Sequence, residues 1–244
     1  MLKVDRVTRK YGNFTAVDRV SFELNDGEVV GFLGPNGSGK TTLLRVITTY
    51  LLPTDGTVTI DGISVTKDSL EVRRRIGYLP ESNILYPQMR VDEYLSFVGQ
   101  VRGLEGPRLK ERLDWCIESM KLQNVVYKKT MECSKGYKQR ISLSAALIHD
   151  PKYLLLDEPT VGLDPLQIFM MRDLLRSIAK NKTILFSSHI LQEVAAIAPR
   201  VIIIHEGKII ADFSFDTETN RTERLEQIFE TAIKEKGAPL EAVK

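Results

Sequence analysis

The chain has 244 residues, of which 43% are hydrophobic and 27% charged, and its formal net charge is +2. These values are typical of a soluble globular protein with one large domain, or with one domain that carries an inserted subdomain. So small a net charge excludes binding to nucleic acid or to an anionic membrane through overall charge, and any basic patch has to be local.

The sequence shows neither a secretion signal nor a membrane span. Its start, MLKVDRVTRKYG, lacks the apolar core of a signal peptide. The longest apolar runs, such as Val201–Ile204, fall far short of the roughly 20 residues that cross a bilayer. Cys116 and Cys133 form no CxxC pair and no disulfide framework, which fits a reducing cytoplasm. We therefore expect the chain to act at a membrane only by docking on another protein.

Two predicted strands near the N-terminus lead into a glycine-rich loop. Val20–Leu24 and Glu28–Leu33 flank the turn Asn25-Asp26-Gly27, and the sequence GPNGSGKTT follows at residues 34–42. It matches the phosphate-binding pattern G-x-x-x-x-G-K-[ST], and the next run, Thr42–Tyr50, is compatible with a helix. The complete strand–loop–helix context predicts a nucleotide-phosphate site rather than a chance glycine-rich turn.

The loop residues suit different parts of a phosphate. The glycines leave room for backbone N–H groups to wrap the β-phosphate, and the helix N-terminus adds partial positive charge. Lys40 can reach the β- and γ-phosphates, and the Thr41 hydroxyl can ligate Mg²⁺. A switch-type GTPase is disfavoured because the nearest NKxD candidate, at residues 181–184, lacks the Asp. The predicted phosphate site consists of Gly34, Pro35, Asn36, Gly37, Ser38, Gly39, Lys40, Thr41 and Thr42.

Helical patterns fill the middle of the chain, after a further predicted strand at Val58–Ile60. Between about residues 86 and 150 the strand signals stop, and Pro107 suits the first turn of a helix. An all-helical block inside an α/β chain predicts an inserted subdomain. The predicted helices are Val91–Arg102, Pro107–Lys121 and Ser134–His149.

Strand signals return after residue 150. The continuous apolar or β-branched runs there are typical of buried strands in a parallel sheet, and their alternation with helical patterns predicts an α/β fold. From about residue 216 the chain is polar apart from one helical pattern, Arg224–Lys236, so residues 216–244 are predicted to form a peripheral tail. The predicted strands are Tyr153–Leu156, Thr183–Ser187 and Val201–Ile204, the last continuing into a hairpin with residues 208–213.

Two adjacent acids, Asp157 and Glu158, follow the apolar run Tyr153–Leu156. Open α/β sheets bind ligands at the carboxyl ends of their strands, so we expect both acids at the nucleotide site. Asp157 suits the coordination sphere of Mg²⁺, and Glu158 is placed to polarise the attacking water. A merely solvated acidic pair is disfavoured by the four buried-type residues directly before it.

Several motifs in the right order resemble the nucleotide-binding subunit of ABC transporters over about residues 1–215. CSKGY at 133–137 stands where that family carries its LSGGQ signature, VGLDP at 161–165 resembles the D-loop, and SSH at 187–189 resembles the strand end with the switch histidine. The resemblance implies a P-loop NTPase (RecA-like) core at about 1–85 and 151–215, an antiparallel β subdomain and a helical subdomain at about 86–150.

The resemblance also implies roles in binding and hydrolysing ATP with Mg²⁺. His189 can hydrogen-bond the γ-phosphate or the attacking water. Ser134, a good N-cap, and Gly136 would contact ATP bound by a second subunit, whose site Asp164 would organise. Tyr11 matches the aromatic residue that stacks on adenine, and we favour stacking over a place in the core. His149 and His205 lack such context and are interpreted as ordinary surface or packing histidines.

Two positions depart from the family pattern. The signature is CSKGY, which keeps Ser134 and Gly136 but replaces a glycine by Lys135 and the glutamine by Tyr137. Glu81, in GYLPE, stands where the family often has glutamine; its oxygen can approach Mg²⁺, although a surface-loop residue is the alternative. Both variants resemble the export-type branch often grouped as ABC-2.

We therefore predict an ATP-binding and ATP-hydrolysing subunit of an ABC transporter. Closure of a dimer on ATP would drive transport, in the export direction, by separate integral membrane subunits, with this chain peripheral on the cytoplasmic face. Its dimer partner would be a second copy or a homologous subunit, and no nucleic acid is expected. The alternative is a soluble ABC ATPase acting on nucleic acid or the ribosome, but such relatives usually have coiled-coil insertions or tandem cassettes. A regulator without turnover would lack Glu158 or His189.

Overall fold

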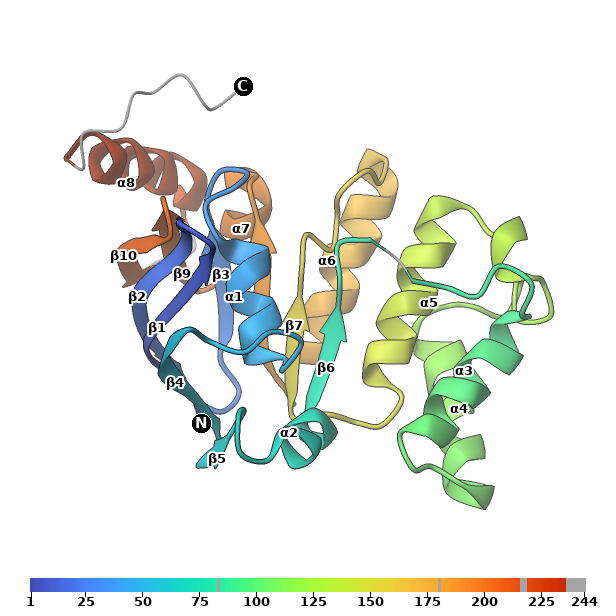
Figure 1. The fold of residues 1–244 in the computed structure, drawn as a ribbon. Coiled ribbons are helices and arrows are strands. Elements are labelled where there is room, and N and C mark those ends of the chain that lie inside the picture. The colour runs from blue at the N-terminus through green and yellow to red at the C-terminus, as the bar shows by residue number, and fades with distance from the viewer. Residues whose placement is uncertain (83, 180, 216–218, 236–244) are drawn as a thin grey trace.

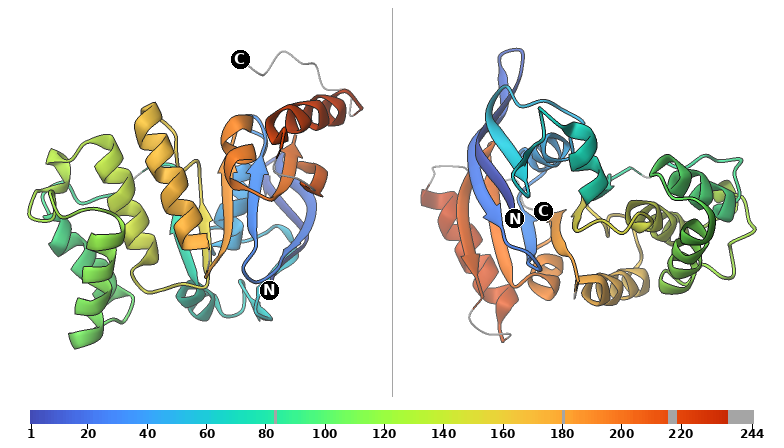
Figure 2. Two further views of the ribbon diagram at one scale, coloured as in Figure 1. Left: turned by 180° about the vertical axis from the view of Figure 1, so that it is seen from behind. Right: turned by 90° about the horizontal axis from the view of Figure 1, so that it is seen from below.

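The described part of the chain forms two β-sheets, helices that pack on them and a separate block of helices (Figure 1). The computed structural model describes residues 1–82, 84–179, 181–215 and 219–235. In both views of Figure 2 the β-rich part and the helical block lie at opposite ends of the molecule. Among the described residues, no helix combines the length and the apolar composition that crossing a membrane requires.

The smaller sheet is antiparallel, as the family resemblance implies, and has the strand order β2-β1-β4-β5. The first strand was not predicted from the sequence, because charged residues interrupt its apolar positions. Its inward-facing side chains, among them Leu2, Val4 and Val7, are nevertheless buried. The four strands are β1 (Leu2–Tyr11), β2 (Phe14–Leu24), β4 (Asp55–Ile60) and β5 (Ile63–Ser64).

The larger sheet has the order β10-β9-β3-β8-β7-β6. Its strands run parallel except for β10, which forms the predicted hairpin with β9. The turn Asn25-Asp26-Gly27, predicted between two strands, carries the chain from β2 in one sheet to β3 in the other, with Gly27 at φ 77°. The strands are β3 (Val29–Leu33), β6 (Ile76–Leu79), β7 (Tyr153–Leu156), β8 (Thr183–Ser188), β9 (Arg200–His205) and β10 (Lys208–Ser214).

The helices between β6 and β7 form the helical block and begin and end close to the predicted bounds. They are α3 (Val91–Val101), α4 (Gly106–Ser119), the short 3₁₀ helix η1 (Thr130–Glu132) and α5 (Lys135–Leu147). Pro107 lies in the first turn of α4, as expected. The remaining helices are α1 (Lys40–Ile47), α2 (Ser69–Arg75), α6 (Pro165–Ala179), α7 (Leu191–Ile197) and α8 (Arg221–Glu235).

The core consists of two buried clusters, one on each face of the larger sheet. Alternate residues of a strand point to opposite faces, so Leu154 and Leu156 join one cluster, whereas Tyr153 and Leu155 join the other. The first cluster includes residues of the helical block, α6, α7 and α8, and the second is shared with α1 and the smaller sheet. The central strands are therefore covered on both faces, as their continuous apolar sequences predict.

Helix α8 is part of the core rather than a peripheral tail. Leu225, Phe229 and Ile233 recur every four residues, lie on one face of the helix and are buried in the first cluster. Figure 1 places α8 beside β10, at the end of the molecule opposite the helical block. The prediction of a peripheral segment was wrong for this helix. Polar residues separate its regularly spaced apolar ones, and this polarity indicated an exposed tail. Residues 216–218 and 236–244 of the predicted tail lie outside the described residues.

The burial of α8 predicts that Phe229→Ala lowers the free energy of unfolding by about 3–5 kcal/mol, the usual cost of removing a buried phenyl ring. Gln227→Ala, an exposed position of the same helix, is the control and should change it by less than about 0.5 kcal/mol. Urea denaturation followed by circular dichroism measures both. Equal stability of the two variants would contradict the packing of α8.

Candidate nucleotide site

Three adjacent parallel strands end at one edge of the larger sheet and place the predicted site residues there. In the register of β3 and β8, Leu33 pairs with Ser188, and in that of β7 and β8, Leu156 pairs with Phe186. The segments that follow these strands begin with Gly34, Asp157 and His189. The structure thus brings together the phosphate loop, the two acids, which follow it by more than a hundred residues, and the switch histidine, which follows Glu158 by 31 residues.

The phosphate loop needs its glycines for conformation and for space. Gly37 and Gly39 have φ values of 78° and 106°, in the region that other residues avoid. A Cβ atom on Gly39 would lie 2.4 Å from the carbonyl oxygen of Ala16, and one on Gly34 would lie 2.3 Å from that of Ile204. The loop is therefore held tightly against both sheets, with α1 beginning at Lys40.

Lys40 is a buried cation in contact with its own loop and with Glu158. Its Nζ donates to the carbonyl oxygens of Gly34 (2.7 Å) and Pro35 (3.1 Å) and lies 3.5 Å from Glu158 Oε1. Burial lowers the pKa of Lys40, and the negative charges of Glu158 and Asp157 oppose that shift. The two carboxylates thus favour the charged ammonium, which is the form that a phosphate would attract.

Asp157 is fully buried and held by two hydroxyl groups. Its Oδ1 accepts hydrogen bonds from Thr41 Oγ1 (3.1 Å) and Ser187 Oγ (2.8 Å). Its Oδ2 is buried without a hydrogen-bond partner among the described residues. Ser187 Oγ also accepts from the N–H of Glu158 at 3.0 Å, which fixes the acidic segment to the end of β8.

The pair Thr41 and Asp157 fits a magnesium ion. Mg²⁺ usually takes one or two protein oxygens and completes its shell with phosphate and water, and an unpartnered buried carboxylate oxygen beside a hydroxyl provides such ligands. The described residues contain no cluster of three or more His, Cys, Asp or Glu side chains that could hold a metal alone.

Glu158 lies between Lys40 and His189. Its Oε2 is 3.0 Å from His189 Nδ1, while Oε1 faces Lys40. Glu158 is 6% exposed, whereas His189 is 35% exposed, so of this pair the histidine is the more open to solvent. The backbone of Glu158 has φ 49°, a left-handed conformation that costs energy for a residue with a side chain and often marks functional sites.

The signature and D-loop residues cap their own helices and also contact each other. Ser134 caps α5 as predicted, its Oγ accepting the N–H of Tyr137 at 3.4 Å. Asp164 Oδ1 accepts the N–H of Gln167 at 2.9 Å, and the side chain of Gln167 covers Gly136. In Figure 1, β6 and β7 separate α5 from α1. The roles of these residues toward a second subunit stay predictions.

Tyr11 and Glu81 are both exposed. Tyr11, at the end of β1, is 44% exposed, and the guanidinium of Arg9 lies 4.9 Å from its ring centroid. A place in the core is therefore wrong for Tyr11, and stacking on adenine stays a prediction. Glu81 lies near enough for its charge to act on the pKa of Lys40, but its exposure also fits the surface-loop alternative.

Sequence reasoning missed three buried polar residues near the site. Gln139 of α5 donates from Nε2 to the carbonyl oxygen of Pro159 at 2.7 Å, and Thr160 donates to the carboxylate of Glu193. Each of the three side chains is 3% exposed. Glu193 is an acid in a helix, LQEVAAI, whose other residues are mostly apolar, and this was the signal that could have found it. Gln139 stands between Lys138 and Arg140, so no such signal marks it in the sequence.

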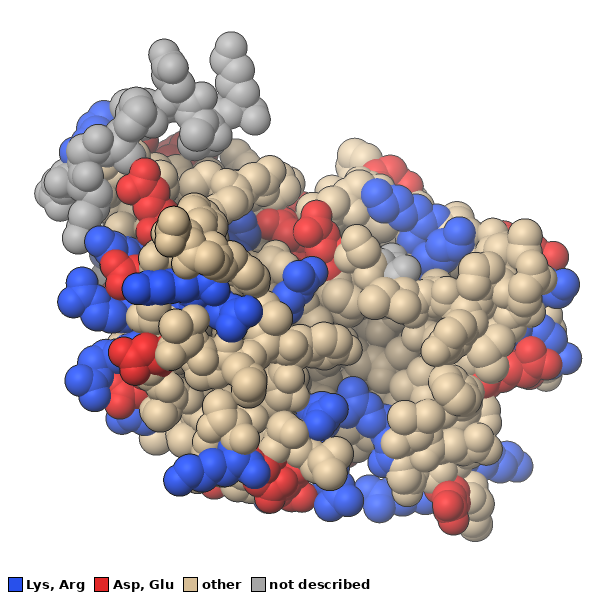
Figure 3. All heavy atoms as spheres, viewed as in Figure 1, with Lys and Arg blue, Asp and Glu red and all other residues tan. Residues whose placement is uncertain are grey.

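A groove of about 750 Å³ separates the helical block from the larger sheet and α2. Figure 3 shows the surface hollowed there, with basic side chains at its lower margin. Four arginines and no Asp or Glu occur among the described residues that line it. Its apolar rim includes Tyr50, Leu70 and Val101, which are exposed, and the arginines are Arg73, Arg74, Arg102 and Arg108.

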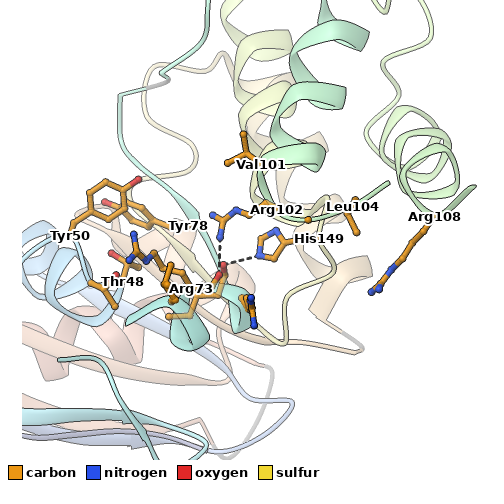
Figure 4. Close-up of a pocket in the computed structure, with 14 residues that line it drawn as sticks. Thr48, Tyr50, Arg73, Tyr78, Val101, Arg102, Leu104, Arg108 and His149 are labelled. Atoms are coloured by element: carbon orange, nitrogen blue, oxygen red, sulfur yellow. Dashed lines mark hydrogen bonds between the residues drawn. The ribbon is translucent and has the colours of Figure 1, made fainter. Parts of the chain in front are cut away.

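Arg102 and His149 lie in the wall of this groove and point to backbone carbonyls near β6 (Figure 4). Arg102 donates to the carbonyl oxygen of Arg73 at 2.8 Å, and His149 Nε2 lies 2.9 Å from that of Ile76. Burial lowers the pKa of Arg102, and the charge of Arg73 adds to the shift. His149 packs as expected of a structural histidine, and burial lowers its pKa to about 4.

The profile of the ABC transporter family matches residues 17–161. The chain belongs to the ABC transporter family. The ABC transporter ATP-binding protein NatA of Bacillus subtilis is 39% identical over 218 residues, which cover 88% of this chain and 89% of NatA. The bacitracin transport ATP-binding protein BcrA of Bacillus licheniformis is 38% identical over 218 residues, which cover 88% of this chain and 70% of BcrA.

Solved structures agree with the sequence comparisons. The ATP-binding subunit of an ABC transporter superimposes with a TM-score of 0.83 and 26% identity, over 95% of this chain and 99% of that one. A dimeric bacterial ABC transporter cassette gives 0.81 and 27%, over 89% and 100%, and its post-hydrolysis state with ADP and Pi gives 0.79. The chain is thus an ATP-binding subunit of an ABC transporter and an ATPase, with the predicted fold, and the non-transport alternative is disfavoured.

The buried His149 predicts a pH-dependent stability of this ABC subunit. Its pKa is about 4 in the folded chain, against about 6.5 when unfolded, so its stabilising contribution is complete above pH 6.5 and is lost as the pH falls toward 4. His149→Gln should therefore show a shallower loss of melting temperature across that interval. Val101→Ala, a non-titrating position of the same groove, should keep the parent's pH dependence. Identical slopes for His149→Gln and the parent would contradict the assignment.

Proposed function

We propose that this subunit hydrolyses ATP at a site completed by a second subunit, either another copy or a homologue. Closure of that dimer would drive export through separate integral membrane subunits, with the chain on their cytoplasmic face. One observation carries the proposal: Lys40, Asp157, Glu158 and His189 meet at one sheet edge, whereas Ser134 and the signature belong to the helical block. Within one chain, the phosphate-binding residues and the signature residues therefore lie in different parts of the structure.

Within one chain, residues 34–42 would hold the phosphates of ATP, with the Lys40 ammonium on the β- and γ-phosphates. Thr41 and Asp157, with Glu81 at the edge of the site, would hold Mg²⁺, which when bound offsets phosphate charge. Glu158 would orient and polarise the attacking water, because one of its oxygens is fixed by His189 and the other by Lys40. His189 would position Glu158 and contact the γ-phosphate, and Tyr11 would stack on adenine.

The second subunit would contribute Ser134 and Gly136. Ser134 is exposed at the N-terminus of α5, a helix of 13 residues whose partial positive charge favours an anion. Asp164, exposed at the start of α6, would lie at the same interface. The similarity to a dimeric cassette supports this pairing. The fold also supports a core at about residues 1–85 and 151–215 with a helical subdomain at 86–150.

Relatives support the export direction. Those that match this chain include a bacitracin transport protein, a Nod factor export protein of Paraburkholderia xenovorans and a linearmycin resistance protein of Bacillus subtilis. The last two are 35% and 34% identical to it. These names join the two motif variants, CSKGY and GYLPE, as the basis for the proposal.

The groove beside α2 and α3 would receive the membrane subunit. Its four arginines, without a lining carboxylate among the described residues, favour a cytoplasmic segment that carries Asp or Glu. Arg102 is already partly desolvated, so an incoming carboxylate would find a cation that has lost much of its hydration. The exposed Leu70 and Val101 at the rim would pack against apolar residues of that segment.

Composite sites predict complementation between two inactive variants. Lys40→Ala and Ser134→Arg should each abolish turnover, and Ser134→Arg should still bind ATP as a monomer in calorimetry. A 1:1 mixture of the two should recover about a quarter of the parent rate, because half of the dimers are mixed and each has one intact site. Two Lys40→Ala preparations mixed together are the control. Failure of Ser134→Arg to bind ATP would contradict the assignment of the signature to the other subunit's nucleotide.

We expect the positive charge of Arg108 to be needed for docking of the membrane subunit in the groove. Arg108→Glu should lose the integral membrane subunit that cross-links to and co-purifies with the tagged chain from its native membranes, while its ATPase rate without that subunit stays at the parent value. Lys110→Glu makes the same charge change two residues away on α4, at an exposed position outside the groove. Equal recovery of the membrane subunit with both variants would rule out the groove as its docking site.

A further inference from the structure

The carboxylate of Glu193 is buried beside the segments that carry Glu158 and His189. Glu193, in the first turn of α7, is 3% exposed and has no role in the site described above. A buried acid is costly unless its oxygens accept hydrogen bonds, so its partners indicate what keeps it there. Its partners come from two separate segments of the chain.

Two hydroxyl groups donate to the same oxygen of Glu193. Thr160 Oγ1 and Ser188 Oγ both bond Oε2, the latter at 3.2 Å, and both residues are buried. Ser188 Oγ in turn accepts the N–H of Ile190 at 3.0 Å. The donor and acceptor roles of each hydroxyl are thereby fixed, so the cluster has one arrangement rather than several.

The two hydroxyls belong to the segments that carry Glu158 and His189. Thr160 follows Glu158 by two residues, while Ser188 precedes His189 and Ile190 follows it. The backbone pairing of β7 with β8 ends at Leu156 and Phe186. Backbone hydrogen bonds between these two strands therefore reach neither Glu158 nor His189. Beyond that point side chains connect the two segments, and the Glu193 carboxylate makes one of these connections.

We propose that Glu193 is a positioning residue for ATP hydrolysis, because its carboxylate ties the segment after Glu158 to the segment around His189 and so sets the distance between those two side chains. That distance is 3.0 Å between Glu158 Oε2 and His189 Nδ1. The proposal rests on the roles given above to Glu158 and His189. Glu193 itself contacts neither the water nor the phosphate.

A positioning role differs measurably from a packing role. Small displacements of catalytic groups lower the rate of the chemical step without weakening substrate binding, whereas a general loss of structure lowers both with the melting temperature. The phosphate loop has its own contacts with the sheets, so loosening the Thr160–Glu193 bond should leave ATP binding unchanged.

Thr160→Val is the sharpest test, since it removes one hydroxyl with little change of volume. We expect kcat to fall about tenfold while KM for ATP changes less than about twofold. Thr130→Val is the matched control: Thr130 is also buried, and its hydroxyl donates to the carbonyl of Tyr86 at 2.6 Å, away from the site. It should lose similar stability but keep the parent's kcat.

Variants of Glu193 provide the second measurement. Glu193→Gln keeps an acceptor oxygen of the same reach and should retain most of the turnover, whereas Glu193→Ala should lose at least as much as Thr160→Val. Parent-like kcat in Thr160→Val, or equal losses in Thr160→Val and Thr130→Val, would overturn the inference. Glu158→Gln and His189→Ala are measured alongside: if these two turn over ATP like the parent, the proposed catalytic roles fail instead.

Discussion

The parallel register of β3, β8 and β7 is the constraint on which the site depends. It brings three segments that are distant in the sequence to one edge, and each segment leaves the sheet within two residues of its last ladder pair. From there on, side chains replace the backbone as the connection: Ser187 joins β8 to Asp157 and to the N–H of Glu158. Such bonds are worth about 1 kcal/mol each when both partners are buried, yet leaving one unmade costs more.

The charges of the site are arranged around this scaffold. The buried ammonium of Lys40 lies 3.5 Å from the buried carboxylate of Glu158, and the charge of the buried Asp157 also acts on it. Burial alone would favour the neutral form of Lys40, and the negative charges of Glu158 and Asp157 oppose that. The remaining imbalance is one negative charge beside an unpartnered oxygen of Asp157, which suits a divalent cation that arrives with an anionic nucleotide. The same imbalance would repel the phosphates if no cation accompanied them.

The sequence alone predicted those features whose local structure and function depend on the same few residues. The phosphate loop, the apolar strands that end in Asp157 and His189, and the Ser134 cap were all predicted because a few adjacent residues determine them. The strand β1 and the burial of α8 were missed, since their apolar residues are separated by charged ones and become significant only when the chain folds back on itself. Glu193 and Thr160 are 33 residues apart, so nothing local connects them.

Contacts of the same kind connect the helical block to the chemistry. Gln139 of α5 donates to the carbonyl of Pro159, one residue after Glu158 and one before Thr160. At the other end of α5, the carbonyl of Ala146 packs so closely on Gly77 of β6 that a Cβ there would lie 2.2 Å away. The C-terminal end of α5 is therefore held against β6 near the groove. Its N-terminal end, near the signature, is bonded to the segment that follows Glu158. Any larger side chain at Gly77 would therefore push α5 away from β6.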